Sequence, residues 1–246
     1  MVQTFKPIKI GFVGAGMVGQ MHLSQYTQLN NVACLSLAEL RTELGKQVSQ
    51  QYGIPALYSN HHEMLADTDL DAVVIVTHRN NTSQVVFDCL QAGKHVFSEK
   101  PMAKTFSQGK KLVEKANAMN RSYIVGYQKR HDKAALIAKQ RLTTLRASLE
   151  LGALKEIHVW NYTGQDRDYS KDFLMTDEPR SLGTDVGAQE PEWLDQKFHS
   201  LYDRFVNVFC HDINMIRFLT EHELTVSETK LEDDQNIQLS FLAEEI

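Results

Sequence analysis

The sequence predicts an α/β protein whose first half is a doubly wound parallel sheet. Apolar runs typical of strands alternate with helical segments from residue 8 to residue 127, and a glycine-rich turn joins the first strand to the first helix. Parallel neighbours need crossover connections, so this alternation predicts right-handed βαβ units. The pattern changes near residue 128, and we therefore expect two domains, 1–127 and 128–246.

The strands of the first half are short and rich in aliphatic and β-branched residues. We expect them at residues 8–13, 32–38, 56–58, 71–77, 95–98 and 123–127. The helices between them are expected at 17–29, 41–52, 61–66, 81–91 and 105–120. Asn60 is suited to cap the third helix, while Gly53 and Gly93 are suited to end the second and the fourth.

The second half has longer and less regular segments. We expect a helix at 132–151 capped by Asp132, a strand at 155–163, a helix at 200–220 and two strands at 224–230 and 236–242. The polar stretch 165–197 has no regular pattern, and a loop of that length is typical of a substrate lid. The sequence stops just after a strand, so we expect the natural protein to continue beyond Ile246.

Composition excludes several classes of function. The chain is 42% hydrophobic and 23% charged, as in ordinary globular proteins. Its net charge of −5 argues against a nucleic-acid partner, and its apolar runs are too short for a membrane span. Cys34, Cys89 and Cys210 are isolated, which favours a reducing, cytoplasmic location. The sequence has no Cys/His cluster that would predict a metal site, and His61-His62 is interpreted as a helix start.

A dinucleotide fingerprint, G-x-G-x-x-G, lies between the first strand and the first helix. Its residues are Gly14, Ala15, Gly16, Met17, Val18 and Gly19. The first glycine permits a tight turn, the second lets a pyrophosphate approach the backbone, and the third lets the helix pack on the strand. The helix N-terminus then presents free N–H groups and a positive dipole end to the phosphates.

A carboxylate follows the fingerprint at the expected distance. Glu39 lies 20 residues after Gly19, at the end of the second strand. There it can accept hydrogen bonds from the adenosine ribose hydroxyls, which predicts NAD as cofactor. Arg41 lies close enough in sequence to bind a 2′-phosphate, so NADP stays open as an alternative.

Two further segments follow strands of the same sheet. Because the carboxyl ends of parallel strands meet at one edge, they should border the same crevice as the fingerprint. These candidate cofactor contacts are Thr77, Asn81, Glu99 and Lys100. A lysine in that position can stabilise negative charge on a substrate oxygen, although taken alone it is as consistent with an ordinary surface lysine.

The helix at 200–220 carries a polar stripe between apolar flanks. Asp203, Asn207, His211 and Asn214 are spaced four, four and three residues apart, as on one face of an α-helix. His211 is suited to act as a general base near neutral pH. A structural histidine within a buried hydrogen-bond network explains the stripe equally well.

These motifs together resemble the glucose–fructose oxidoreductase/inositol dehydrogenase (Gfo/Idh/MocA) family. The resemblance rests on G-A-G-M-V-G, on the T-x-x-N segment after residue 76, on A-G-K-H-V-F-S-E-K-P at 92–101 and on H-D-I-N-M-I-R-F-L at 211–219. It implies a Rossmann domain followed by an α+β domain with a mostly antiparallel sheet. It also implies an NAD(P)-dependent dehydrogenase for a sugar, polyol or related hydroxy compound, assembled as a homo-oligomer.

The resemblance assigns roles to three residues. Lys100 takes the place of the lysine of the E-K-P motif, and His211 that of the catalytic histidine. Asn207 stands where the family usually has an aspartate, and an amide orients the imidazole without adding charge. The alternative to catalysis is a dinucleotide-binding sensor or assembly protein of the same fold.

Overall fold

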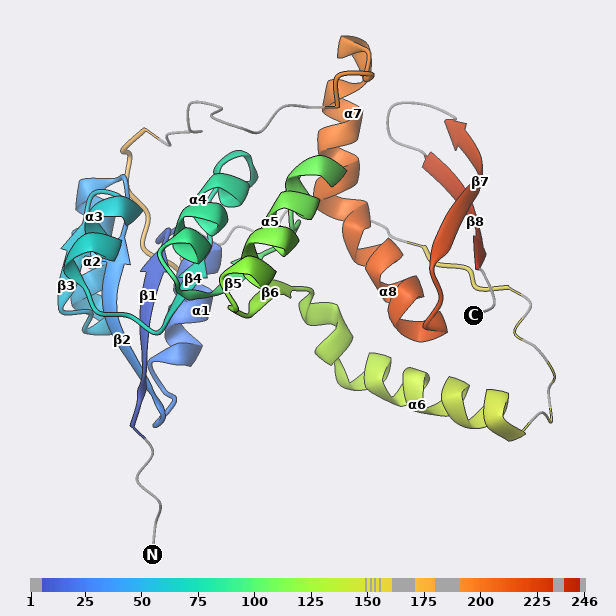
Figure 1. The fold of residues 1–246 in the computed structure, drawn as a ribbon, viewed down its shortest axis with the longest axis horizontal. Helices are drawn as coiled ribbons and strands as arrows, with labels where there is room; N and C mark the ends of the chain where they lie inside the picture. The colour runs from blue at the N-terminus through green and yellow to red at the C-terminus, as the bar shows by residue number, and fades with distance from the viewer. Residues whose placement is uncertain are drawn as a thin grey trace, which may run out of the picture. The chain divides into compact units, whose positions relative to one another are not determined.

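The chain forms two compact units in a computed structural model (Figure 1). The first comprises Met1–Gly126 with Gln165–Glu192, and the second comprises Tyr127–Gly164 with Trp193–Ile246. Within them the structure describes residues 6–148, 150, 152, 154, 156–160, 171–179, 191–231 and 237–243.

The first unit is built on a six-stranded parallel sheet with strand order β3-β2-β1-β4-β5-β6. Its strands are β1 (Ile8–Val13), β2 (Val32–Ala38), β3 (Ala56–Tyr58), β4 (Ala72–Ile75), β5 (His95–Glu99) and β6 (Tyr123–Gly126). This is the strand order of a Rossmann fold, and it confirms the predicted parallel sheet. The order reverses between β1 and β4, where ligands bind in sheets of this kind.

Helices cover both faces of this sheet (Figure 1). They are α1 (Met17–Tyr26), α2 (Thr42–Tyr52), α3 (His61–Asp67), α4 (Arg79–Gln91) and α5 (Phe106–Ala118). Leu23 of α1 and Leu44 of α2 share one buried cluster, whereas Met64 of α3, Leu90 of α4 and Leu112 of α5 share another. Strands buried on both faces are therefore uniformly apolar, as the sequence of β4 predicted.

Local signals set the ends of these helices. The side chain of Asn60 accepts a hydrogen bond of 3.0 Å from the Glu63 amide, so it caps α3 as predicted. Gly53 ends α2 in the left-handed conformation. α4 begins at Arg79, two residues before the predicted start, because the His78 side chain caps it by accepting from the Asn80 amide.

The segment 171–179 belongs to the first unit, although the sequence predicted that it would lie in the second domain, 128–246. Gln20 is fully buried and exchanges two hydrogen bonds of 3.0 Å with the backbone N–H and C=O of Leu174. Glu178 accepts from the Glu43 and Leu44 amides, each at 2.9 Å, and so caps the N-terminus of α2. Contacts between residues this far apart in sequence leave no local pattern.

The second unit is mainly helical in its described part. Its elements are η1 (Gln128–His131), α6 (Lys133–Ser148), η2 (Gln196–Phe198), α7 (His199–Arg204), the π-helix η3 (Phe205–Phe209), α8 (Cys210–Thr220), β7 (Leu224–Leu231) and β8 (Ile237–Ala243). β7 and β8 pair antiparallel. Asp132 caps α6 by accepting from the Ala134 amide at 2.8 Å, as predicted.

Two predictions for this unit were wrong. The stretch 156–160 forms no strand, and the remainder of the predicted strand 155–163 lies outside the described residues. The predicted helix 200–220 is present as the continuous helical run α7–η3–α8, but the stripe from Asp203 to Asn214 does not lie on one α-helix, because the i→i+5 hydrogen bonding of η3 shifts the helical period. Most of the predicted lid at 165–197 also lies outside the described residues.

Cationic side chains of α6 stabilise the end of α8. Arg146 donates a hydrogen bond of 2.8 Å to the carbonyl of Thr220, and the ammonium of Lys139 lies 2.8 Å from the carboxylate of Glu221. Positive charge is favourable at a helix C-terminus. None of the helices described in either unit is long and apolar enough to cross a membrane.

The cysteines are all free thiols. Cys89 is buried, and burial raises the pKa of its thiol to about 12. Cys34 is partly buried on β2, where burial raises the pKa of the thiol to about 11. Both therefore remain protonated at neutral pH and behave as small core residues, as the sequence predicted.

Replacing Leu37 tests the core of the first unit. Leu37 is fully buried on β2, so Leu37→Ala should lower the free energy of unfolding by about 2–5 kcal/mol through lost burial and a residual cavity. Leu29→Ala is the control, because Leu29 is 48% exposed and its truncation should change stability by under about 0.5 kcal/mol. Urea unfolding followed by circular dichroism measures both; equal effects would contradict the packing described.

Replacing Glu178 tests the attachment of 171–179. The Glu43 amide, followed by that of Leu44, holds the pKa of the Glu178 carboxyl below its usual 4.5. The stabilisation is therefore complete above pH 4.5 and is lost as the pH falls through the lowered pKa. Glu178→Ala should abolish hydrogen-exchange protection of the Glu43 and Leu44 amides at neutral pH. Asp177→Ala removes an exposed neighbouring carboxylate and should leave that protection unchanged.

Candidate functional site

The glycine-rich loop lies at the point where the strand order reverses. Gly14 has a φ of +99°, and a Cβ there would stand 2.3 Å from the carbonyl oxygen of Val76. A Cβ at Gly19 would stand 2.4 Å from the carbonyl oxygen of Gly14. Both obstructions are backbone atoms, which no side-chain movement relieves. These two positions therefore require glycine.

The second glycine of the motif plays a different part. Gly16 has extended backbone and precedes α1, and within the described residues no side chain caps this helix start. Among the described residues, a Cβ at Gly16 would have only the Arg41 guanidinium within 4 Å, at 3.8 Å. The first amides of α1 are thus presented at an open edge beside a positive charge. Helix starts of this kind bind anions such as phosphate.

The loop is attached to the neighbouring strand as well. The Gly14 amide donates to the carbonyl of Ala38 at 2.9 Å, and Ala38 is the last residue of β2. The ends of β1, β2 and β4 consequently meet at this loop. The loop geometry is fixed by backbone contacts on both sides.

Glu39 lies directly against the loop. Its side chain is buried and accepts from the Ala15 amide at 2.7 Å, a short charge-assisted hydrogen bond. It also accepts from the Arg41 Nε at 2.9 Å and from the Arg41 amide at 3.0 Å. The two residues that the sequence offered as rival indicators of NAD and NADP are therefore paired with each other.

Thr77 and Asn81 both follow β4, but Thr77 precedes α4 and Asn81 lies within it. Thr77 precedes α4 and shares a hydrogen bond of 3.2 Å with the hydroxyl of Thr82. Asn81 lies within the first turn of α4, and its amide donates to the carbonyl of His78 at 2.9 Å. Both remain at the carboxyl edge of the sheet, since β4 runs parallel to β1.

Glu99 and Lys100 stand at the end of β5. One Glu99 oxygen lies 2.9 Å from the Nε2 of His22 on α1, and the other accepts from the Lys100 amide at 3.2 Å. The His22 ring meets Phe97 edge to face, with centroids 5.3 Å apart. Glu99 thus links the fingerprint helix to the backbone of Lys100. Sequence reasoning missed His22, whose only local signal is its position one turn after Gly19 on α1.

His211 and Asn207 lie in the second unit. His211 is in the first turn of α8, where its ring meets Tyr127 edge to face at a centroid distance of 6.3 Å. Asn207 lies within η3, so the predicted i, i+4 stripe is not that of one α-helix. Asn214 accepts from Arg130 at 2.5 Å. Lys100 belongs to the first unit, so an active site shared with His211, which the family roles of the two residues imply, stays a prediction.

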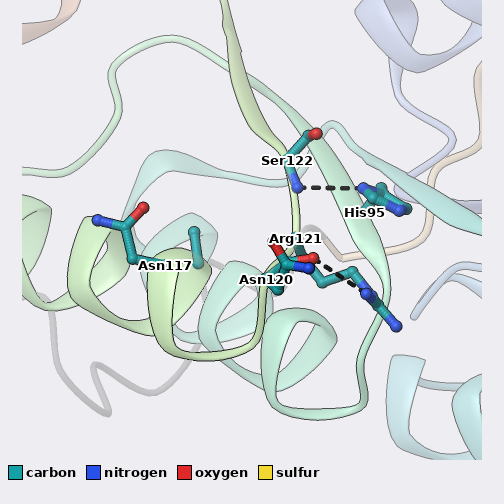
Figure 2. A pocket seen from close by; sticks show the side chains of 6 residues that line it. His95, Asn117, Asn120, Arg121 and Ser122 are labelled. Carbon is teal, nitrogen blue, oxygen red and sulfur yellow. Dashed lines mark hydrogen bonds between the residues drawn. The ribbon is translucent and has the colours of Figure 1, made fainter.

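A hollow at the other edge of the sheet is not part of this site. Figure 2 shows its lining around the starts of β5 and β6, with the Ser122 amide donating to His95 at 3.0 Å and Arg121 donating to the carbonyl of Asn120. Strand starts lie at the amino edge of a parallel sheet, opposite the glycine loop. Ligands of such sheets bind at the carboxyl edge.

Comparison with known proteins shows what the first unit is similar to. Residues 8–127 match the GFO_IDH_MocA family model, described as an oxidoreductase family with an NAD-binding Rossmann fold. The myo-inositol 2-dehydrogenase of Thermotoga maritima is 24% identical over 159 residues, which cover 65% of this chain and 46% of that protein. The inositol 2-dehydrogenase/D-chiro-inositol 3-dehydrogenase of Shouchella clausii is 30% identical over 138 residues, which cover 55% of this chain and 40% of that protein.

A solved structure has the same fold. The scyllo-inositol dehydrogenase of Lactobacillus casei, with bound NAD(H) and scyllo-inositol, aligns over 90% of this chain and 58% of that protein, with a TM-score of 0.64 and 20% identity. The matched regions thus span about half the length of these relatives. Residues 8–127, just under half of the chain, thus match the oxidoreductase family with an NAD-binding Rossmann fold that the motifs resemble.

Proposed function

We propose that the protein interconverts a secondary alcohol and its ketone on a polyol or sugar, with NAD as the hydride carrier. The observation that carries this proposal is the glycine loop, in which Gly14 and Gly19 have no room for a Cβ and no side chain of the described residues caps the start of α1. The match to an NAD-binding oxidoreductase family supports the cofactor, and the names of the inositol dehydrogenase relatives support the substrate class.

The cofactor's two ends would be held by different parts of the carboxyl edge. Gly14 and Ala15, whose amides are bound to Ala38 and Glu39, would shape the loop, and the backbone amides of Gly16, Met17, Val18 and Gly19 would seat the pyrophosphate. Glu39 would accept from the adenosine ribose. The segments after β4 and β5 would border the nicotinamide through Thr77, Asn81, Glu99 and Lys100.

The pairing of Glu39 with Arg41 favours NAD over NADP. Arg41 donates to the Glu39 carboxylate through Nε at 2.9 Å and through Nη2 at 3.3 Å. A 2′-phosphate would have to compete for that guanidinium and would approach the negative charge of Glu39. Like charges brought together in a binding site weaken affinity.

In the proposed reaction each protein group moves or stabilises one charge. When bound, NAD supplies a hydride acceptor beside the alcohol carbon. His211 takes the hydroxyl proton as general base, and Asn207 positions its imidazole. Lys100 donates to the same oxygen and stabilises negative charge as it develops. The hydrogen bond from the Lys100 amide to the Glu99 carboxylate holds the backbone from which the lysine side chain extends.

One observation favours a second function. Asn207 stands where the family usually has an aspartate, and an amide adds no charge that raises the proton affinity of His211. A protein that binds dinucleotide without turnover, as a sensor or assembly partner, is therefore the second candidate. We also propose a cytoplasmic location, from the isolated cysteines, and assembly as a homo-oligomer.

Lys100→Ala separates catalysis from binding. We expect NAD affinity to change little, while the rate of polyol-dependent NAD reduction falls by about 10²–10³-fold because the developing alkoxide loses a donor. Lys110→Ala, which removes a lysine with a 64% exposed side chain on α5, is the matched control. Initial rates with a panel of inositols and sugars measure the effect. A parent chain that binds NAD tightly but reduces none with any substrate would favour the second candidate.

Titration with both reduced cofactors tests the preference for NAD. The chain should bind NADH at least about tenfold more tightly than NADPH because of the Glu39 charge. Glu39→Gln keeps the side-chain shape and should reduce this ratio, whereas Glu43→Gln on the exposed start of α2 should not. Fluorescence of the bound nicotinamide gives both dissociation constants. Tighter binding of NADPH by the parent would contradict the assignment.

A further inference from the structure

Two adjacent histidines meet an aspartate from another helix on the surface of the first unit. His61 and His62 begin α3, and Asp88 lies near the end of α4. One nitrogen from each histidine and one oxygen from the aspartate lie within 4.8 Å of one another. These three residues are separate from the glycine loop, from Glu39 and from Lys100.

Both imidazoles are directed at the same carboxylate oxygen. The Nε2 of His61 lies 2.9 Å from Asp88 Oδ2, and the Nε2 of His62 lies 3.7 Å from that same atom. The centroids of the two rings are 4.0 Å apart and the ring planes are inclined by 36°, so the rings lie next to each other. A simple hydrogen bond to Asp88 needs one histidine and does not explain the position of the second.

The spacing agrees with a tetrahedral metal ion. Zinc bonds of about 2.0–2.2 Å to nitrogen and oxygen place the ligand atoms roughly 3.3 Å from one another. The two nitrogen–oxygen distances, 2.9 and 3.7 Å, lie on either side of that value. The two histidine nitrogens lie within 4.8 Å of each other, so binding one ion would draw the three atoms closer together.

The surroundings also suit a metal. Gln84 donates a hydrogen bond of 2.9 Å to the other oxygen of Asp88, which orients Oδ2 toward the histidines. Hydrogen bonds of this kind commonly hold metal-binding carboxylates in place. The side chains of His61 and Asp88 are 14% and 19% exposed, whereas that of His62 is 68% exposed. Water thus has access from the His62 side to a fourth coordination position.

We propose that His61, His62 and Asp88 bind a divalent transition metal, with zinc as the representative ion and water as the fourth ligand. Imidazole and carboxylate are a suitable ligand set for zinc. The ion would join α3 to α4, so binding would stabilise the folded first unit by mass action. This site would be structural and independent of the proposed dehydrogenase reaction.

The experiment titrates zinc chloride into the chain after removal of any affinity tag and treatment with a chelator. Isothermal titration calorimetry should show one zinc ion per chain. His62→Ala and Asp88→Asn should each weaken binding by more than about tenfold. Asp88→Asn keeps an oxygen for Gln84, and His62 is exposed, so both variants should fold, as circular dichroism will verify. His131→Ala removes an exposed histidine elsewhere and should bind zinc like the parent.

Thermal unfolding gives a second measurement. Zinc should raise the Tm of the parent and of His131→Ala but not that of Asp88→Asn. The proposal is overturned if the parent binds no stoichiometric zinc. It is also overturned if the His62 and Asp88 variants bind zinc as tightly as the parent, because the ion would then lie elsewhere.

Discussion

The first unit depends on the close approach of the glycine loop to the end of β4. Backbone oxygens of Val76 and Gly14 occupy the space that a Cβ at Gly14 or Gly19 would need. This contact brings α1 down onto the sheet and leaves its first amides at the open edge. An anion-binding helix start and a tightly packed sheet edge are therefore two results of the same constraint.

Polar side chains complete this arrangement by bonding to the backbone. Glu39 accepts from Ala15, Gln20 links the loop carbonyl of Ala15 to Leu174, and Glu99 links His22 to the amide of Lys100. These groups are buried or half-buried, so each needs its partner to avoid a desolvation cost. Their bonds hold the carboxyl edge in one geometry. Sites organised in this way require little rearrangement when a ligand binds.

Some departures from the sequence-based expectations come from contacts between residues that are distant in sequence. The stripe from Asp203 to Asn214 assumed one continuous α-helix, but η3 shifts the helical period within it. The segment 171–179 has no pattern of its own and takes its place from Gln20 and Glu178. The pair His61-His62 is a helix start, as expected, and it also faces a carboxylate 26 residues along the chain from His62. For 171–179 and for His61-His62, contacts distant in sequence decided the outcome.

The sequence by itself determined the alternating strands and helices of the first unit, the glycine fingerprint and the match of residues 8–127 to an oxidoreductase family. These features follow from local chemistry: apolar periodicity, helix caps such as Asn60, and the steric freedom of glycine. Only the tertiary structure decided that Glu39 pairs with Arg41, that His22 supports Glu99 and that 171–179 packs on α1 and α2. Such contacts depend on the distance between side chains in the folded chain, which neither spacing nor composition encodes.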